Sequence, residues 1–326
     1  LRVEDLERDG RLAGLMEALR EAIPRSRKQP ILTREEAIRL AMGGAVEAAS
    51  QFGLDPNLLE GIEERGALFG TGGADRQEVL DALDEGCLEK GRYSFGFIGG
   101  GNHFLELQSV EEILEPEACR ELGLEPGRIV IMYHTGSERF GHDLGRLYAV
   151  RLKTSRRRRR KYFLRKIPLH LMRGVRSPGQ AARRWRYHFS KDNYIPVPAD
   201  SPEGRRLAVS LKAAGNFGYA NRVAVLDLIR RGIAKATGGG GEEEYRIIAD
   251  LSHNVVAREE IGGRDLWVHR HNSVRLRPPS AWPDGSLYRH IGQPSMLAGS
   301  NRSSSYLMLS REGAAEALHS ADHGAG

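Results

Sequence analysis

Histidines beside glycine-rich loops and apolar runs are the residues of this sequence best suited to chemistry. His103 follows three glycines, 99–101, and Asn102, and it precedes the mostly apolar run 104–107, which reads as a strand. Consecutive glycines let backbone N–H groups turn inward and let a ligand approach the main chain closely. A histidine fixed beside such a loop suits metal binding or acid–base catalysis. A glycine hairpin with a structural histidine explains this stretch equally well.

The arrangement of an apolar run followed by a histidine recurs along the chain. Three further runs read as buried strands that lead into a histidine: 128–133 before His134, 245–250 before His253, and 265–268 before His269. Another histidine, His323, lies close to the last residue. Functional sites gather at strand ends in mixed α/β proteins. Histidines brought together in this way suit borderline divalent metals such as zinc or manganese.

Composition limits the class of protein. The 326 residues are 40% hydrophobic, which is enough for one large domain or two smaller ones. No run approaches 18 apolar residues and the first residues are charged, so we expect neither a membrane span nor a signal peptide. The only two cysteines, Cys87 and Cys119, provide no disulfide framework and favour a cytoplasmic location. The net charge of +6 fits an anionic partner but decides little alone.

The expected elements alternate between helices and strands, which predicts a mixed α/β (α+β) fold. Residues 1–90 read as helical, with a capping box from Thr33 to Glu36 and a helix over 76–84 that Gly86 ends. Beyond them we expect strands at 104–107, 128–133, 245–250, 265–268 and 306–309, and helices near 110–122, 141–152 and 203–235.

A basic region at 153–200 reads as an insertion or linker within the domain. It contains five consecutive arginines, 156–160, and then further arginines interleaved with aromatic residues: Arg173, Arg176, Arg183, Arg184 and Arg186 with Trp185, Tyr187 and Phe189. Basic and aromatic side chains together could bind single-stranded nucleic acid through charge and stacking. A solvated, mobile arginine loop and aromatic residues that pack against the domain are the alternatives.

Nine short motifs carry a family resemblance. They are GGGNHFLEL at 99–107, HTGS at 134–137, NFGYANR at 216–222, SHN at 252–254, VHR at 268–270, GQP at 292–294, AGS at 298–300, SY at 305–306 and HGAG at 323–326. In this order the set resembles the RtcB family of tRNA-splicing RNA ligases. The resemblance spans roughly residues 80–326.

The resemblance implies a fold and a metal site. It implies one RtcB-like catalytic domain over 1–326, incomplete at both ends, with a central histidine-lined cleft for metal and guanylate. Manganese (Mn²⁺) would be bound by His103, His134 and His253, as part of a two-metal site in the complete protein. The family also uses an Asp and a Cys from an upstream segment, and Cys87 does not match that pattern.

The resemblance also implies a covalent mechanism. His323 would take GMP from GTP and pass it to an RNA 3′-phosphate or 2′,3′-cyclic phosphate end, which a 5′-hydroxyl RNA end then joins. The chain has no P-loop motif, so the guanylate site rests on the matching positions. These are Asn102, Glu106, Asn254, Ala298, Gly299, Ser300, Asn301, Ser305, Gly324, Ala325 and Gly326. The implied partners are GTP, RNA such as tRNA halves, and an accessory activating protein.

Three departures from the family's pattern put substrate specificity in question. HRHNSV at 269–274 replaces HRKGAT, and AGSNR at 298–302 replaces PGSMG. In HTGSERFG, Glu138 stands before Arg139 and displaces the family's arginine by one residue. The family's guanine-contacting C-terminal lysine is also absent, so we expect a divergent or truncated member. A metal-dependent phosphodiesterase and an inactive, basic RNA-binding module are the rival functions.

Overall fold

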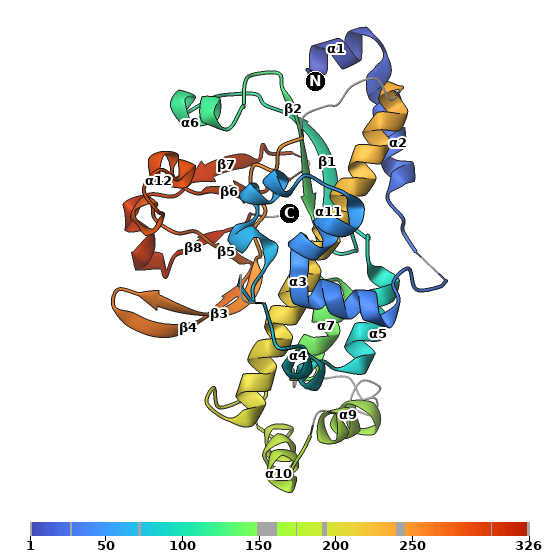
Figure 1. The fold of residues 1–326 in the computed structure, drawn as a ribbon, viewed down its shortest axis with the longest axis vertical. Coiled ribbons are helices and arrows are strands. Elements are labelled where there is room, and N and C mark those ends of the chain that lie inside the picture. Colours follow the sequence, from blue (N-terminus) through green and yellow to red (C-terminus); the bar gives the residue numbers. More distant parts are fainter. Residues whose placement is uncertain are drawn as a thin grey trace.

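The long helix α11 (Pro202–Thr237) organises the fold. The computed structural model describes residues 2–26, 28–70, 73–148, 162–173, 175–190, 194–238, 245–300 and 302–324. Figure 1 shows α11 running along the molecule, with helices on one side and strand pairs on the other. Ser201 caps its first turn by accepting a hydrogen bond from the backbone of Gly204, and Gly238 ends it in the left-handed conformation. The predicted helix over 203–235 is therefore confirmed.

A layer of helices packs against α11. It comprises α1 (Val3–Arg8), α2 (Arg11–Ala22), α3 (Arg34–Phe52), α4 (Arg76–Ala82), α5 (Glu85–Ser94) and α7 (Arg139–Arg146), with the 3₁₀ turns η1 (Pro56–Gly61) and η2 (Glu63–Gly66). The capping box of Thr33 and Glu36 is formed as predicted. Buried apolar side chains, including Ile38, Leu40 and Phe217, make the main core between α3 and α11.

Four two-stranded antiparallel sheets form the other side within the described ranges. They pair β1 (Phe104–Ser109) with β2 (Ile129–His134), β3 (Asn254–Ile261) with β4 (Arg264–His271), β5 (Ser273–Arg275) with β8 (Ser320–Asp322), and β6 (Pro294–Leu297) with β7 (Tyr306–Leu309). Short helices complete this side: α6 (Pro116–Glu121), η4 (Pro279–Ala281), α12 (Leu287–Ile291) and η5 (Glu312–Ala317). The mixed helix-and-strand class is confirmed. Even α11 lacks an apolar stretch that could span a bilayer, and no other described helix has one.

Gly86 does not end a helix, contrary to the prediction. The chain leaves the helical conformation at Leu83, and the side chain of Asp84 then caps α5 by accepting from the backbone N–H of Cys87 at 2.9 Å. Asp84 also pairs with Arg173 at 2.5 Å, and a Cβ on Gly86 would collide with that guanidinium group. Gly86 therefore allows a close approach inside a helix.

Four other predicted elements differ from the structure, among them the helix expected over 141–152, which is α7 and ends at Arg146. Residues 245–249 form no strand, and Asp250 makes only a single parallel bridge to Ile62. The predicted strand 265–268 is part of the longer β4, so His269 lies inside a strand and not at its end. The helix expected over 110–122 is shorter because Pro116 begins α6.

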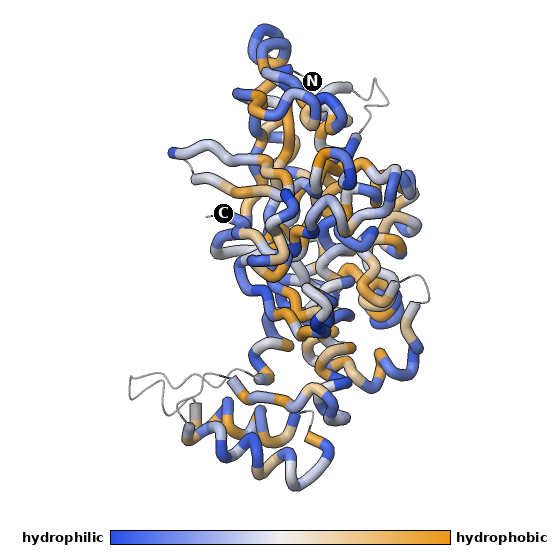
Figure 2. Tube along the Cα trace, turned by 90° about the vertical axis from the view of Figure 1, so that its left-hand side faces the viewer, coloured by the Kyte–Doolittle hydropathy of each residue, from blue (hydrophilic) through white to orange (hydrophobic). Residues whose placement is uncertain are grey.

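The basic region forms a small lobe at one end of the molecule where it is described. Its helices are η3 (Tyr162–Lys166), α9 (Ile167–Met172) and α10 (Pro178–Tyr187), and Figure 2 shows them projecting from the main body. Arg184 is buried and donates to Glu203 at 2.8 Å, and Arg183 pairs with the same carboxylate. Arg173 binds Asp84, and Arg176 donates to the carbonyl of Asp81. These four arginines thus bind the protein itself, whereas the arginine run 156–160 lies outside the described residues.

Candidate functional site

Three histidines from distant parts of the sequence meet in the structure. His134 ends β2, His253 lies just before β3, and His323 follows β8. One ring nitrogen from each lies within 4.8 Å of the other two. The Nε2 atoms of His134 and His253 are 3.3 Å apart, and the ring centroids of His253 and His323 are 4.8 Å apart. The structure therefore brings together one residue predicted as the nucleophile and two predicted as metal ligands.

Strand pairing and backbone bridges position these rings. In the register of β1 and β2, Phe104 lies opposite His134, which places His103 at the same end of the pair. The backbone N–H of Ser273 donates to the carbonyl of His253 at 3.2 Å and ties the His253 loop to β5. The backbone N–H of Ala298 donates to the carbonyl of His323 at 3.0 Å, so the residue that follows β6 fixes the backbone of His323.

His103 borders the three histidines and has a different environment. Its ring centroid is 5.0 Å from that of His134. Its Nδ1 lies 2.8 Å from the carbonyl of Ile98 and 2.8 Å from a carboxylate oxygen of Glu138. The hydrogen bond that His103 donates to the Glu138 carboxylate raises the pKa of His103, although burial opposes this shift.

Burial keeps two of the rings neutral. It lowers the pKa of His134 to about 4 and that of His253 to about 3, and neighbouring positive charge adds to the shift. A neutral imidazole keeps a lone pair for a metal ion. His323 is half-buried, and neither of its ring nitrogens has a hydrogen-bond partner, since Asp322 lies 3.7 Å from Nδ1. Imidazole nitrogens that lie within 4.8 Å of one another fit a borderline divalent cation.

A cleft connects the three histidines with part of the predicted guanylate site. It has a volume of about 1,430 Å³ and is lined by His134, His253 and His323 together with Glu106, Ala298, Ser300 and Ser305. The hydroxyl of Ser305 accepts from the backbone N–H of Gly299 at 3.0 Å. A side chain on Gly299 would collide with the carbonyls of Ser303 and Ser304, so the turn requires glycine there. Gly324 pairs with Ala298 in a parallel bridge.

Two other predicted guanylate residues, Asn102 and Asn254, are not among those that line this cleft. Asn102 is exposed in the glycine loop and does not line it. Asn254 is exposed, and its side-chain oxygen lies 2.8 Å from the His271 ring and accepts from the backbone of Asn272 at 3.1 Å. Asn301, Ala325 and Gly326 lie outside the described residues.

Comparison with known proteins decides the family. The family model described as tRNA-splicing ligase RtcB matches residues 1–326. The chain belongs to the RtcB family. The match includes the N-terminal helices, which lie outside the region where sequence motifs carried the resemblance.

Curated RtcB proteins of archaea and bacteria are similar to this chain. The tRNA-splicing ligase RtcB of Pyrococcus abyssi is 32% identical over 274 residues, which cover 82% of this chain and 26% of the relative. The relative from Thermococcus kodakarensis is 31% identical and 50% covered. The RNA-splicing ligase RtcB of Mycobacterium tuberculosis is 30% identical over 97% of this chain and 66% of the relative. The chain thus spans between a quarter and about two thirds of these RtcB proteins.

Two residues of α11 hold the loops of this RtcB site together. The Asn221 side chain accepts from the backbone of Gly96 at 2.6 Å and donates to the carbonyls of Phe97 and Gly136. It therefore joins the segment before the glycine loop to the segment after His134. Arg222 donates to buried Asp250 at 2.6 Å, three residues before His253. Both residues stand in the NFGYANR motif, but the motif alone gave them no role.

Glu138 is the other residue that the sequence did not reveal as part of the site. The sequence showed only an acidic residue beside a displaced arginine, whereas the structure places its carboxylate against His103. Nothing in the local pattern relates residues 103 and 138, since the pairing of β1 and β2 brings them together.

Proposed function

We propose that this protein joins RNA ends. An RNA 3′-phosphate, or a 2′,3′-cyclic phosphate after its opening by water, would be joined to a 5′-hydroxyl end with GTP as co-substrate and manganese as the metal. The observation that carries the proposal is the meeting of His323 with His134 and His253 in one cleft of an RtcB-family chain. The chain covers only 26% and 66% of two of its relatives, so the RNA-joining activity of the complete proteins is proposed for it.

The proposed metal ligands are His103, His134 and His253. Burial keeps His134 and His253 unprotonated at neutral pH, so that their nitrogens can bind a cation without first losing a proton. Three imidazoles leave other positions of a manganese ion to oxygen ligands, which manganese prefers. Bound metal would neutralise charge on the phosphate oxygens that face His323.

His323 is the proposed nucleophile. One of its ring nitrogens would attack the α-phosphorus of GTP, forming a P–N bond while the P–O bond to pyrophosphate breaks. An oxygen of the RNA 3′-phosphate would then attack the same phosphorus and break the P–N bond. Finally the 5′-hydroxyl oxygen would attack the RNA phosphate, lose its proton and release GMP. Neither ring nitrogen is engaged in a hydrogen bond, which leaves His323 free for the first step.

The guanylate would lie along the wall of the cleft. The Glu106 carboxylate can accept hydrogen bonds from the N–H groups of guanine, and Ser300 and Ser305 offer hydroxyls to ribose or phosphate. Gly324 leaves room for a phosphate close to the backbone. Asn102 and Asn254 are also proposed to contact the guanylate.

We further propose that residues 1–326 form one catalytic domain, within which 153–200 is a basic region. We propose a cytoplasmic location for the protein because both of its cysteines are free.

An RNA-joining assay tests this proposal. A strand ending in a 3′-phosphate and a labelled 5′-hydroxyl strand are incubated with GTP and manganese, using the wild type, His323→Ala and the control His290→Ala. His290 is an exposed histidine of α12, outside the cleft. We expect a joined product with the wild type and the control, and none with His323→Ala. Joining by His323→Ala, or joining without GTP, would contradict the proposal.

One observation favours the phosphodiesterase as a second candidate. The Asn254 side-chain oxygen lies 2.8 Å from the ring of His271, which stands where the family's pattern has Lys, and so one predicted guanylate contact is engaged by the protein itself. A histidine-bound metal could instead activate water to cleave RNA. The same assay without GTP distinguishes the two, since only the phosphodiesterase shortens RNA under those conditions.

A further inference from the structure

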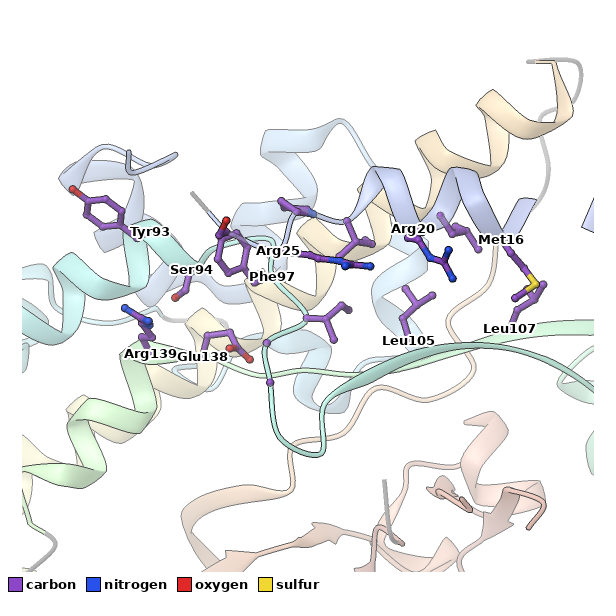
Figure 3. A pocket seen from close by; sticks show the side chains of 17 residues that line it. Met16, Arg20, Arg25, Tyr93, Ser94, Phe97, Leu105, Leu107, Glu138 and Arg139 are labelled. Atoms are coloured by element: carbon purple, nitrogen blue, oxygen red, sulfur yellow. The ribbon is translucent and has the colours of Figure 1, made fainter. Parts of the chain in front are cut away.

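The carboxylate of Glu138 lies against the proposed metal ligand His103. Glu138 stands just before α7, and its side chain is only 13% exposed. One carboxylate oxygen is 2.8 Å from Nδ1 of His103, and the hydroxyl of Thr135 donates to the same oxygen at 3.2 Å. Figure 3 shows the side chain beside the glycine loop, between Arg139 and the strand that carries Leu105.

The backbone at Glu138 is strained. Its φ of +48° with ψ of −127° is a conformation that residues with a side chain rarely adopt. Such strain persists only where the surroundings impose it, and it concentrates at functional sites. The glycine loop accommodates the carboxylate, because a Cβ on Gly99 would lie 2.3 Å from one of its oxygens.

Hydrogen bonding to Nδ1 defines which nitrogen of His103 can bind a metal. The carbonyl of Ile98 and the carboxylate of Glu138 both engage Nδ1, which leaves Nε2 available. A carboxylate behind a ligating histidine fixes the ring and makes it a stronger ligand. Among the four clustered histidines, all of which the structure describes, only His103 has a carboxylate at hydrogen-bonding distance, since Asp322 is 3.7 Å from His323.

We propose that Glu138 is a positioning residue that holds His103 with Nε2 free for a divalent cation and strengthens the binding of that cation. The inference rests on the proposed function, because it takes His103 to be a metal ligand. In the family's HTGSRG-type run an arginine stands at the position of Glu138. The strained backbone holds the carboxylate of Glu138 against the histidine.

Manganese titrations test the proposal without any catalytic readout. Free Mn²⁺ is followed by electron paramagnetic resonance as it is added to the wild type, Glu138→Gln and the control Glu117→Gln. Glu117 also pairs with a histidine, His290, at 3.2 Å, but both are exposed and lie outside the cleft. We expect Glu138→Gln to bind manganese about 10-fold or more weakly, the usual loss for a residue behind a ligand. Glu117→Gln should match the wild type.

Glu138→Gly separates positioning from simple support of the fold. Glycine adopts positive φ readily, so this variant should unfold at the same temperature as the wild type or higher, while its manganese affinity still falls about 10-fold or more. Equal manganese affinity of Glu138→Gln and the wild type would overturn the inference alone. A wild type that binds no manganese would overturn the proposed metal site and this inference with it. A Glu138→Gly variant with a lowered unfolding temperature would assign Glu138 to the fold and contradict the positioning role.

Discussion

Replacing Asp250 by alanine should destabilise the protein strongly. Asp250 and Arg222 form an ion pair with a distance of 2.6 Å between Arg222 Nε and Asp250 Oδ1, and the side chains are only 7% and 9% exposed respectively. Arg222 also donates to the carbonyl of Thr135 at 3.3 Å and lies over the ring of Tyr219. Removing the carboxylate leaves a buried guanidinium group with no opposite charge beside it.

The expected loss follows from that burial. Breaking a buried pair by removing one partner costs about 3–5 kcal/mol, because an uncompensated charge stays buried. The weak bond to Thr135 and the contact with Tyr219 replace only part of the lost interaction. An exposed pair of the same residue types, Arg258 and Asp265, has side chains 65% and 53% exposed and should contribute at most about 1 kcal/mol.

Urea unfolding of the two matched variants measures the difference. We expect Asp250→Ala to lower the free energy of unfolding by about 3–5 kcal/mol, and Asp265→Ala by less than about 1 kcal/mol. Adding Arg222→Met to Asp250→Ala should recover part of the loss, because no unpaired charge then remains buried. Equal effects of Asp250→Ala and Asp265→Ala would refute the argument that this pair is a buried support of the histidine site.

Three further predictions concern the helical layer and the lobe. Gly44→Ala should lower the free energy of unfolding by at least about 2 kcal/mol, because φ is +59° there and a Cβ would lie 1.9 Å from the carbonyl of Gly66; a neutral effect in urea unfolding would contradict this close approach. Burial lowers the pKa of His188 to about 4 from an unfolded value of about 6.5, so the folded state binds fewer protons between these values. The free energy of unfolding should therefore fall as the pH drops from about 6.5 to about 4, and less steeply in His188→Gln; identical pH profiles would disprove this. Trp185→Ala should weaken binding of single-stranded RNA by about 5-fold or more, because Trp185 is 49% exposed beside Phe189 and its ring can stack on a base. Trp267→Ala removes another exposed tryptophan, and an equal loss of RNA affinity in that variant would contradict RNA binding by the lobe.

The sequence predicted those helices and strands that are marked by their own residues, such as a capping residue or an apolar run. The capping box at Thr33 and the apolar runs of β1 and β2 specify local structure through residues close together in the sequence. The run 245–250 has a strand-like composition, but whether it pairs with another strand depends on residues far away in the sequence. Asp250 is bridged to Ile62 and paired with Arg222, and residues 245–249 pair with no strand in the structure.

The same distinction applies to the site. Individual histidines could be recognised from their neighbours, but their meeting depends on how β8, β2 and the loop before β3 are placed around α11. For the basic stretch around Arg184 the sequence left RNA binding and packing against the domain as alternatives, and in the structure Arg184 is buried against Glu203. Glu138 could not be identified because its role depends on a contact with His103 across the β1–β2 pair.

Covalent labelling with GTP tests the central claim most directly. The protein is incubated with manganese and GTP labelled at the α-phosphate, then denatured, and the labelled peptide is identified by mass spectrometry. We predict an acid-labile guanylate on His323 that is absent in His323→Ala and present in His290→Ala. Label on another residue, or none on the wild type while it still binds RNA, would contradict a histidine-guanylate mechanism and favour the RNA-binding module.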